Sequence, residues 1–176
     1  DYGVRRGENV VIMSESSEDS LCTWFGIQLA GAVEVAINTG YRGRTLEHAL
    51  QNSRARLIFV DSQHLPKLAE LGEALTCLEA AVVYDDAASE TARPNLQIYS
   101  FKEFQGSREG APDCPVALHD LASIVYTSGT TGPAKGVMMP HGQVSLFARL
   151  GVEGARMTED DVHFCFIPLY HVAGKY

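Results

Sequence analysis

The sequence predicts an α/β domain whose core is a doubly wound, mostly parallel sheet built from βα units. Two observations support this fold class. Short runs of apolar, β-forming residues recur along the chain, and segments with apolar residues at helical spacing separate them. Because a strand–helix–strand order joins two parallel strands, this regular alternation indicates a doubly wound sheet. No Gly-x-Gly-x-x-Gly follows the first run, so a dinucleotide site has no support.

The first half of the chain supplies most of these units. Its strands are expected at residues 10–13, 32–37, 56–60, 80–84 and 97–101, and its helices at 17–30, 45–52 and 65–71, with a helical turn at 101–104. The first helix follows hydroxyls and acids at Ser16 to Asp19, as helix starts prefer, and Gly31 ends it. Trp24 lies on the apolar stripe of this helix, so we expect it in the core. We expect His48 and His64 to be solvated.

The second half is expected to continue the pattern after a connector. Its strands are predicted at residues 122–126, 137–139 and 162–167, its helix at 143–157, and its turns at 140–142 and 158–161. Residues 85–95 are acidic and are expected to form an exposed loop. Residues 106–115 hold two prolines, two glycines and several charges, which predicts a flexible connector. The chain then divides into a first βα sheet region at 1–105, the connector, and a second region at 116–176.

The composition is that of one soluble globular domain. The chain has 176 residues, of which 45% are hydrophobic and 20% are charged, enough for one sizeable core. Its net charge of −8, from 14 basic and 22 acidic residues, argues against a nucleic-acid surface, which needs a basic patch. A donor-rich loop can still bind a nucleotide locally.

Cysteine usage and hydropathy indicate a cytoplasmic protein. The four cysteines are spread widely and show no metal-ligand spacing: Cys22, Cys77, Cys114 and Cys165. We therefore expect free thiols in a reducing compartment and no metal site. No apolar run reaches the length of a membrane span, and no signal peptide precedes the first expected strand.

A loop of hydroxyls, glycines and one lysine lies between the strands expected at 122–126 and 137–139. Its glycines let backbone N–H groups approach an anion closely, and consecutive N–H groups can form a concave anion-binding nest. The loop adds one mobile positive charge from Lys135 and hydroxyl donors from Thr127, Ser128, Thr130 and Thr131. This composition predicts a phosphate-binding loop.

Two other interpretations of this loop are weaker. The P-loop of nucleotide triphosphatases needs a glycine before its lysine and a hydroxyl after it. Here Ala134 precedes Lys135 and Gly136 follows it, so the P-loop interpretation is rejected. A surface hairpin would also favour glycine, proline and serine, but it would not require four hydroxyls, three glycines and a lysine so close together.

The segment from Thr127 to Gly136, TSGTTGPAKG, resembles the phosphate-binding signature of the adenylate-forming superfamily. That superfamily includes acyl-CoA synthetases, adenylation domains of peptide synthetases and beetle luciferases. Residues 7–61 resemble the same region of acyl-CoA synthetases. Pro168-Leu169-Tyr170-His171 resembles the superfamily's Pro-Leu-aromatic-His motif, which borders the carboxylate substrate pocket.

The resemblance implies a two-step reaction. A carboxylate attacks the α-phosphate of ATP to give an acyl adenylate and pyrophosphate, and a thiol, most often CoA, then displaces AMP. ATP, Mg²⁺ and CoA are the implied cofactors and substrates, and a small carboxylic acid, of the kind met in fatty acid metabolism, is the implied partner. Lys135 and His171 are the implied catalytic residues. The implied cofactor-binding residues are Thr127, Ser128, Gly129, Thr130, Thr131, Gly132 and Lys135.

The same resemblance implies an incomplete chain. The family's adenine pocket, magnesium-binding glutamate, ribose-binding aspartate and C-terminal catalytic lysine all fall beyond Tyr176, and the chain begins at Asp1 without a methionine. We therefore expect part of a large N-terminal domain, inactive by itself. Gly174-Lys175-Tyr176 departs from the apolar continuation that the family shows. An adenylation domain that loads a carrier protein and a non-catalytic remnant stay open as alternatives, and the acid's chain length is not indicated.

Overall fold

The computed structural model describes residues 2–75, 77–85, 96–105, 110, 113–127 and 133–176. Nearly all of the loop expected at 85–95 and much of the connector expected at 106–115 lie outside these residues. No helix in the described part of the chain combines the length and apolar character needed to cross a membrane. The four cysteines are free thiols.

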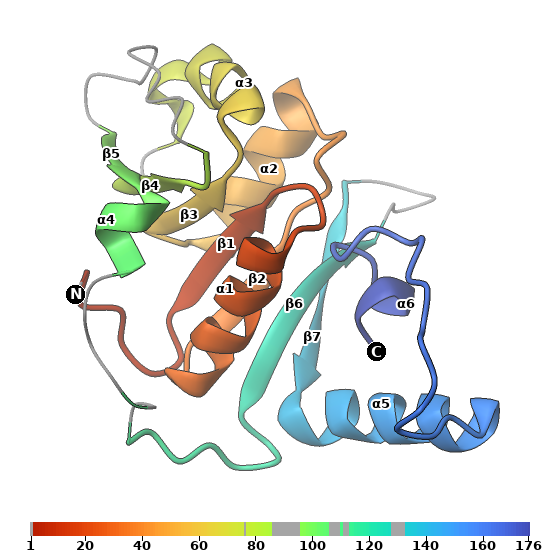
Figure 1. Cartoon of the computed structure of the whole chain (residues 1–176). Helices are drawn as coiled ribbons and strands as arrows, with labels where there is room; N and C mark the ends of the chain where they lie inside the picture. The colour runs from red at the N-terminus through yellow and green to blue at the C-terminus, as the bar shows by residue number, and fades with distance from the viewer. Residues whose placement is uncertain (1, 76, 86–95, 106–109, 111–112, 128–132) are drawn as a thin grey trace.

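A seven-stranded sheet forms the centre of the fold (Figure 1). The strand order is β5-β4-β3-β1-β2-β6-β7, with parallel pairing from β5 to β6 and an antiparallel pair between β6 and β7. The strands are β1 (Asn9–Met13), β2 (Val33–Ala36), β3 (Leu57–Val60), β4 (Ala80–Val83), β5 (Gln97–Ser100), β6 (Leu121–Thr127) and β7 (Lys135–Pro140). Because β6 pairs with β2, segments on both sides of the connector contribute to one sheet. The division into regions 1–105 and 116–176 stays a prediction.

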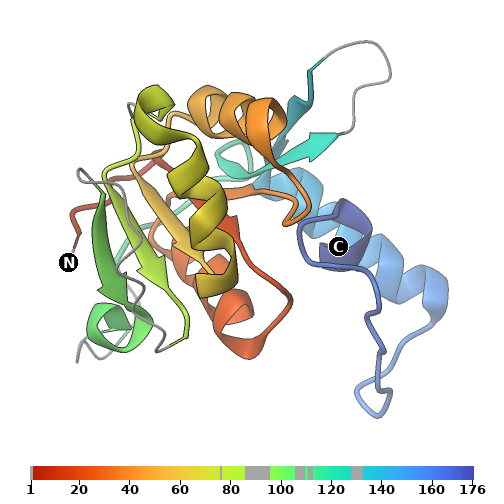
Figure 2. The same ribbon diagram turned by 90° about the horizontal axis from the view of Figure 1, so that it is seen from above.

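Helices cover both faces of the parallel part of the sheet, with α1 and α4 on one face and α2 and α3 on the other (Figure 2). The helices are α1 (Glu18–Leu29), α2 (Gly43–Ser53), α3 (Leu65–Glu70), α4 (Phe101–Gln105), α5 (His141–Ala155) and α6 (Val172–Lys175), with short 3₁₀ turns η1 (Ser62–His64) and η2 (Gly72–Ala74). The predicted doubly wound, mostly parallel sheet is therefore confirmed.

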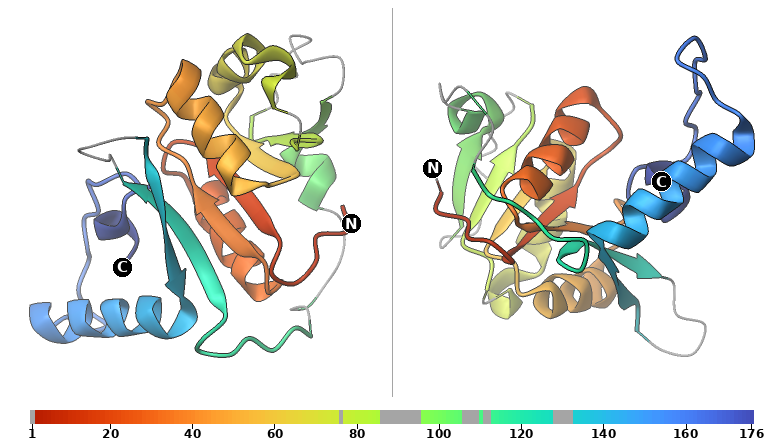
Figure 3. Two further views of the ribbon diagram at one scale, coloured as in Figure 1. Left: turned by 180° about the vertical axis from the view of Figure 1, so that it is seen from behind. Right: turned by 90° about the horizontal axis from the view of Figure 1, so that it is seen from below.

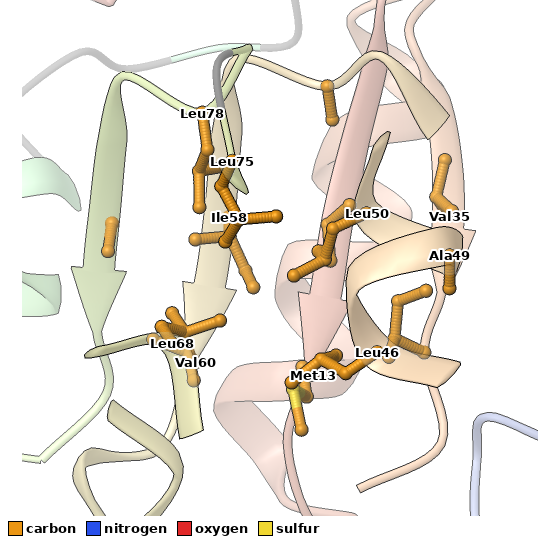
Figure 4. Packing of buried hydrophobic residues seen from close by; sticks show 14 of the residues in the cluster. Met13, Val35, Leu46, Ala49, Leu50, Ile58, Val60, Leu68, Leu75 and Leu78 are labelled. Carbon is orange, nitrogen blue, oxygen red and sulfur yellow. The ribbon is translucent and has the colours of Figure 1, made fainter. Parts of the chain in front are cut away.

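Side-chain alternation along β1 explains the two cores. Val11 and Met13 point to the face where α2 contributes Leu46 and Leu50, as Figure 4 shows for the residues that it labels. Val10 and Ile12 point to the opposite face, where they pack with residues of α1 and α4. Because successive strand residues face opposite sides, a strand covered by helices on both faces is expected to be apolar along most of its length.

Helix α1 confirms the expected start, end and core residue. The Ser17 and Ser20 side chains each accept a hydrogen bond from the other's backbone N–H, which closes a capping box. Trp24 is buried, with only 6% of its surface exposed. Gly31 follows the helix at φ +69°, and a Cβ there would lie 2.5 Å from the sulfur of Cys114. This position therefore favours glycine for both its backbone angle and its lack of a side chain.

The structure corrects the expected turn at residues 140–142, because α5 begins directly at His141. Its first two N–H groups donate to carbonyls of the segment that precedes β6, His141 to Asp120 at 2.9 Å and Gly142 to Leu118 at 2.8 Å. These bonds occupy N–H groups that the first turn of a helix leaves without intrahelical partners. Helix α5 projects from one end of the β6–β7 hairpin (Figure 3), and among its residues Val144 is buried.

The strand expected at residues 162–167 is not formed. Its apolar side chains are exposed, with Val162 at 97%, Phe164 at 82% and Phe166 at 78%. A strand is stabilised by hydrogen bonds to a neighbour, and none of the described residues pairs with this segment. The apolar composition of residues 162–167 is typical of a strand, but no neighbouring strand pairs with this segment in the described structure.

His64 is buried rather than solvated, which corrects the expectation for this residue. Turn η1 places its Nδ1 atom 3.2 Å from Nζ of Lys67 and its Nε2 atom 3.4 Å from a carboxylate oxygen of Glu15. Lys67 Nζ also donates to the Thr39 carbonyl at 2.5 Å. Burial, followed by the charge of Lys67, lowers the pKa of His64. The neutral ring therefore fits this site, with Nδ1 accepting from Lys67.

Candidate functional site

The described ends of the Thr/Gly loop lie at the carboxyl edge of the parallel sheet. Thr127 is the last residue of β6, Lys135 is the first of β7, and the two are paired in register. The Thr127 hydroxyl donates to the Lys135 carbonyl at 3.4 Å, and both side chains are exposed. Ligands of open α/β sheets bind at this edge. The predicted residues between them lie outside the described structure: Ser128, Gly129, Thr130, Thr131 and Gly132.

Helix α2 supports the β6 side of the loop through Tyr126. The Tyr126 hydroxyl lies 3.0 Å from the Ala49 carbonyl and 2.9 Å from Oδ1 of Asn52, and it donates its single proton to one of these acceptors. Burial raises the pKa of Tyr126 to about 12, so the hydroxyl stays protonated at neutral pH. The residue before Thr127 is therefore fixed to the helix.

The same helix supports the β7 side of the loop through His48. Its Nε2 atom lies 3.1 Å from the carbonyl oxygen of Ala134, the residue before Lys135. His48 is half-buried, so its side chain is only partly solvated. A hollow of about 390 Å³ lies between α2 and residues 133–134, and Arg44 and His48 belong to its lining.

Gly136 lets β7 pass close to β6 directly after Lys135. A Cβ at this position would lie 2.8 Å from Cγ2 of Ile124 and 3.5 Å from the ring of Tyr126. Any larger residue would push the start of β7 away from β6, and Lys135 would move with it. Gly136 therefore contributes to the loop by allowing close packing between the strands.

His171 lies directly before α6, on a segment held beside the end of β1. The Leu169 N–H donates to the Ser16 hydroxyl at 3.2 Å, and the His171 N–H donates to the Pro168 carbonyl at 3.0 Å. The imidazole of His171 is exposed, and its ring centroid lies 4.7 Å from that of Tyr170. Among the described residues, no hydrogen bond or ion pair connects His171 with the ends of the Thr/Gly loop. The described ends of the Thr/Gly loop and the His171 segment thus lie at one edge of the sheet, with no direct hydrogen bond or ion pair between these described residues.

Sequence reasoning missed a buried ion pair below the His171 segment. Lys175 of α6 pairs with Glu34 of β2, and their side chains are 2% and 1% exposed. Two signals in the sequence pointed to it. Glu34 interrupts an otherwise apolar strand, and Lys175 stands where the family resemblance leads one to expect an apolar residue. Neither signal shows by itself that the two charges meet.

A metal site finds no support in the described part of the chain. No group of three or more His, Cys, Asp or Glu side chains within it is arranged to hold a metal ion. The Thr127 hydroxyl and the Lys135 ammonium, both exposed, are hydrogen-bond donors of the kind that suit phosphate.

Comparison with known proteins identifies the family. The model for AMP-binding enzymes matches residues 1–176. The chain belongs to the AMP-binding enzyme family. Among its curated relatives, 4-coumarate–CoA ligase 3 of Arabidopsis thaliana is 29% identical over 174 residues, which are 97% of this chain and 30% of that protein. The long-chain-fatty-acid–CoA ligase ACSBG2 of Xenopus laevis is 29% identical over 185 residues, covering 98% of this chain and 25% of that protein.

Solved structures of this family share the fold. The anthranilate CoA ligase AuaEII, in complex with anthranoyl-AMP, is 32% identical with a TM-score of 0.74, covering 85% of this chain and 28% of that one. The long-chain-fatty-acid–CoA ligase FadD1 from Archaeoglobus fulgidus is 25% identical with a TM-score of 0.82, covering 98% and 32%. The chain thus has the fold of the N-terminal domain of adenylate-forming enzymes and spans about a third or less of these relatives.

Proposed function

We propose that this chain is part of a longer, ATP-dependent CoA ligase and supplies the phosphate-binding part of its N-terminal domain. The enzyme would activate a carboxylic acid as acyl-AMP with release of pyrophosphate, and would then form a CoA thioester. One observation carries the proposal. The exposed side chains of Thr127 and Lys135 lie in register at the mouth of a loop with the adenylate-forming signature, at the carboxyl edge of the sheet. Several relatives in the family are named as CoA ligases, which supports the acceptor.

The chemistry of the first step requires control of negative charge. A carboxylate and a triphosphate repel each other, and pyrophosphate leaves with several negative charges. Donors fixed in advance at the developing charge lower this barrier without reorganisation. We assign Thr127, Lys135 and the loop residues 128–132 to the β- and γ-phosphates. Helix α2 keeps both ends of the loop in place through Tyr126 and His48.

His171 is proposed to border the carboxylate substrate. Its exposed imidazole and its position beside the end of β1 support this role. Mg²⁺ would neutralise phosphate charge when bound. We further propose that the protein works in the cytoplasm, consistent with its four free thiols.

An adenylation domain that loads a carrier protein is the second candidate. It would use the same phosphate loop, and the acceptor would decide between the two. The relatives named above are CoA ligases, which favours CoA. The acids in their names include 4-coumarate, anthranilate and long-chain fatty acids, so the acid is left to experiment. A non-catalytic remnant would show no exchange with any acid.

Carboxylate-dependent ATP–pyrophosphate exchange on the complete protein tests the proposal. The panel should contain short, medium, long and aromatic acids, followed by CoA or a carrier protein as acceptor. We expect exchange with at least one acid and thioester formation with CoA. Lys135→Ala should reduce exchange strongly, whereas Arg149→Ala, which removes an exposed cation from α5, should leave it unchanged. Absence of exchange across the whole panel would reject the function.

A further inference from the structure

The buried pair of Glu34 and Lys175 connects four elements of the fold. Lys175 Nζ of α6 contacts one carboxylate oxygen of Glu34 in β2, and the other oxygen accepts a hydrogen bond from the Ser123 hydroxyl of β6 at 2.5 Å. Lys175 Nζ also lies 4.5 Å from the ring centroid of Trp24 in α1, within cation–π range. The short helix α6 is thereby connected to β2, through Glu34 to β6, and to α1.

A buried ion pair contributes little net stability to a fold, but it can fix the position of the element that carries one of the charges. Removing two charges from water costs several kcal/mol per ion, and apolar residues of similar size often stabilise a fold equally well. Breaking the pair by removing one partner, however, leaves an unpaired buried charge. Glu34 and Lys175 therefore favour one position of α6 over every other, because any shift separates the charges.

The segment that carries His171 is held at both ends. At its start, the Leu169 N–H donates to the Ser16 hydroxyl beside the end of β1. At its end, Lys175 meets Glu34 on the neighbouring strand β2. Between these anchors, the His171 carbonyl accepts a hydrogen bond from the Gly174 N–H at 3.0 Å, and its imidazole stays exposed. The backbone position of His171 is therefore restrained from both sides by the two anchors.

We propose that Glu34 and Lys175 are positioning residues that hold the Pro168–Lys175 segment so that His171 faces the carboxylate substrate. This inference rests on the proposed function. Ser123 extends the same contact to β6, the strand that ends at Thr127. The pair thus connects the His171 segment with β2 and β6 of the sheet.

The test uses the complete protein and compares three variants: Lys175→Met, Glu34→Gln, and the double variant. The single variants leave one buried charge unpaired and are expected to lower the melting temperature. The double variant removes both charges and should restore it. In all variants that fold, the KM for the acid should rise about tenfold or more, because displaced contacts weaken orientation. The KM for ATP should stay within about twofold, because Thr127 and Lys135 are retained.

A second measurement does not depend on activity. Hydrogen–deuterium exchange of a peptide covering residues 168–175 should be faster in the double variant than in the wild type, because the Lys175 anchor is lost. Arg149→Met/Glu153→Gln is the matched control, since it removes an exposed ion pair from α5 and should change none of these readouts.

The outcomes distinguish failure of the positioning role from failure of the proposed function. A double variant with wild-type KM for the acid and wild-type exchange at residues 168–175 would overturn the positioning role and leave the proposed function standing. A wild-type enzyme that activates no acid would reject the proposed function. Faster exchange in the double variant of that enzyme would still support the anchor, and unchanged exchange would overturn it.

Discussion

Replacing Trp24 by alanine should strongly destabilise this domain, whereas the same change at its neighbour Phe25 should not. Both residues are large and aromatic, lie on α1, and stack on each other with ring centroids 4.7 Å apart. Trp24 is 6% exposed and belongs to the core cluster beneath α1, whereas Phe25 is 48% exposed. Trp24 and Phe25 therefore differ mainly in burial, because both are aromatic and lie on the same helix.

The magnitude follows from the environment of each ring. Truncating a buried large aromatic to alanine costs about 3–5 kcal/mol, because transfer energy is lost and a cavity remains. Trp24 also contacts Tyr176, at 5.5 Å between ring centroids, and the ammonium of Lys175, so we place its cost in the upper half of that range. Phe25 keeps about half of its surface in water, so its cost should be about 1–2 kcal/mol.

Urea denaturation of the complete protein, followed by circular dichroism, measures both losses as shifts of the transition midpoint at constant slope. Equal losses at the two positions, or a loss below about 1 kcal/mol at Trp24, would refute the core assignment. Loss of ATP binding with unchanged stability would instead mean that Trp24 is a ligand platform.

Three further predictions concern charge and exposed surface. Lys135→Ala in the complete protein should slow adenylation more than thioester formation from preformed acyl adenylate, and equal slowing of both half-reactions would contradict its pyrophosphate role. Because the pKa of His64 is lowered on folding, the unfolded state binds more protons once the pH falls below about 6.5, so stability should be full above that pH and decline below it. His64→Gln should flatten this decline in pH-dependent melting curves, and a slope identical to that of the wild type would argue against it. Residues 1–176 expressed alone should release no pyrophosphate, bind ATP weakly, and bind hydrophobic dyes through exposed residues such as Met138, Phe164 and Phe166. Calorimetry showing a soluble monomer with tight, magnesium-dependent ATP binding would contradict that prediction.

Local patterns predicted well wherever the local signal and the tertiary environment agreed. The apolar runs that became β1 to β4 are buried on both faces, so their composition alone identified them. The run at 162–167 has a similar composition, but a strand also requires a neighbour, and composition carries no information about pairing. The expectation that His64 is solvated was wrong for a related reason. Its burial beside Lys67 depends on how turn η1 packs, which the local sequence does not show.

The sequence predicted the fold class, the capped helix at the first crossover and the burial of Trp24, and the structure confirms these. The phosphate-binding role of the loop at 127–136 stays a prediction from its motif. These properties depend on residue periodicity and on a continuous motif, both of which are local. The folded chain was needed to show which distant residues meet: Tyr126 with Asn52, His48 with Ala134, and Glu34 with Lys175. Such contacts depend on strand order and helix packing, so their partners are separated by tens of residues or more. A charged residue within an apolar strand predicts that it has a partner, but the folded chain is needed to identify that partner.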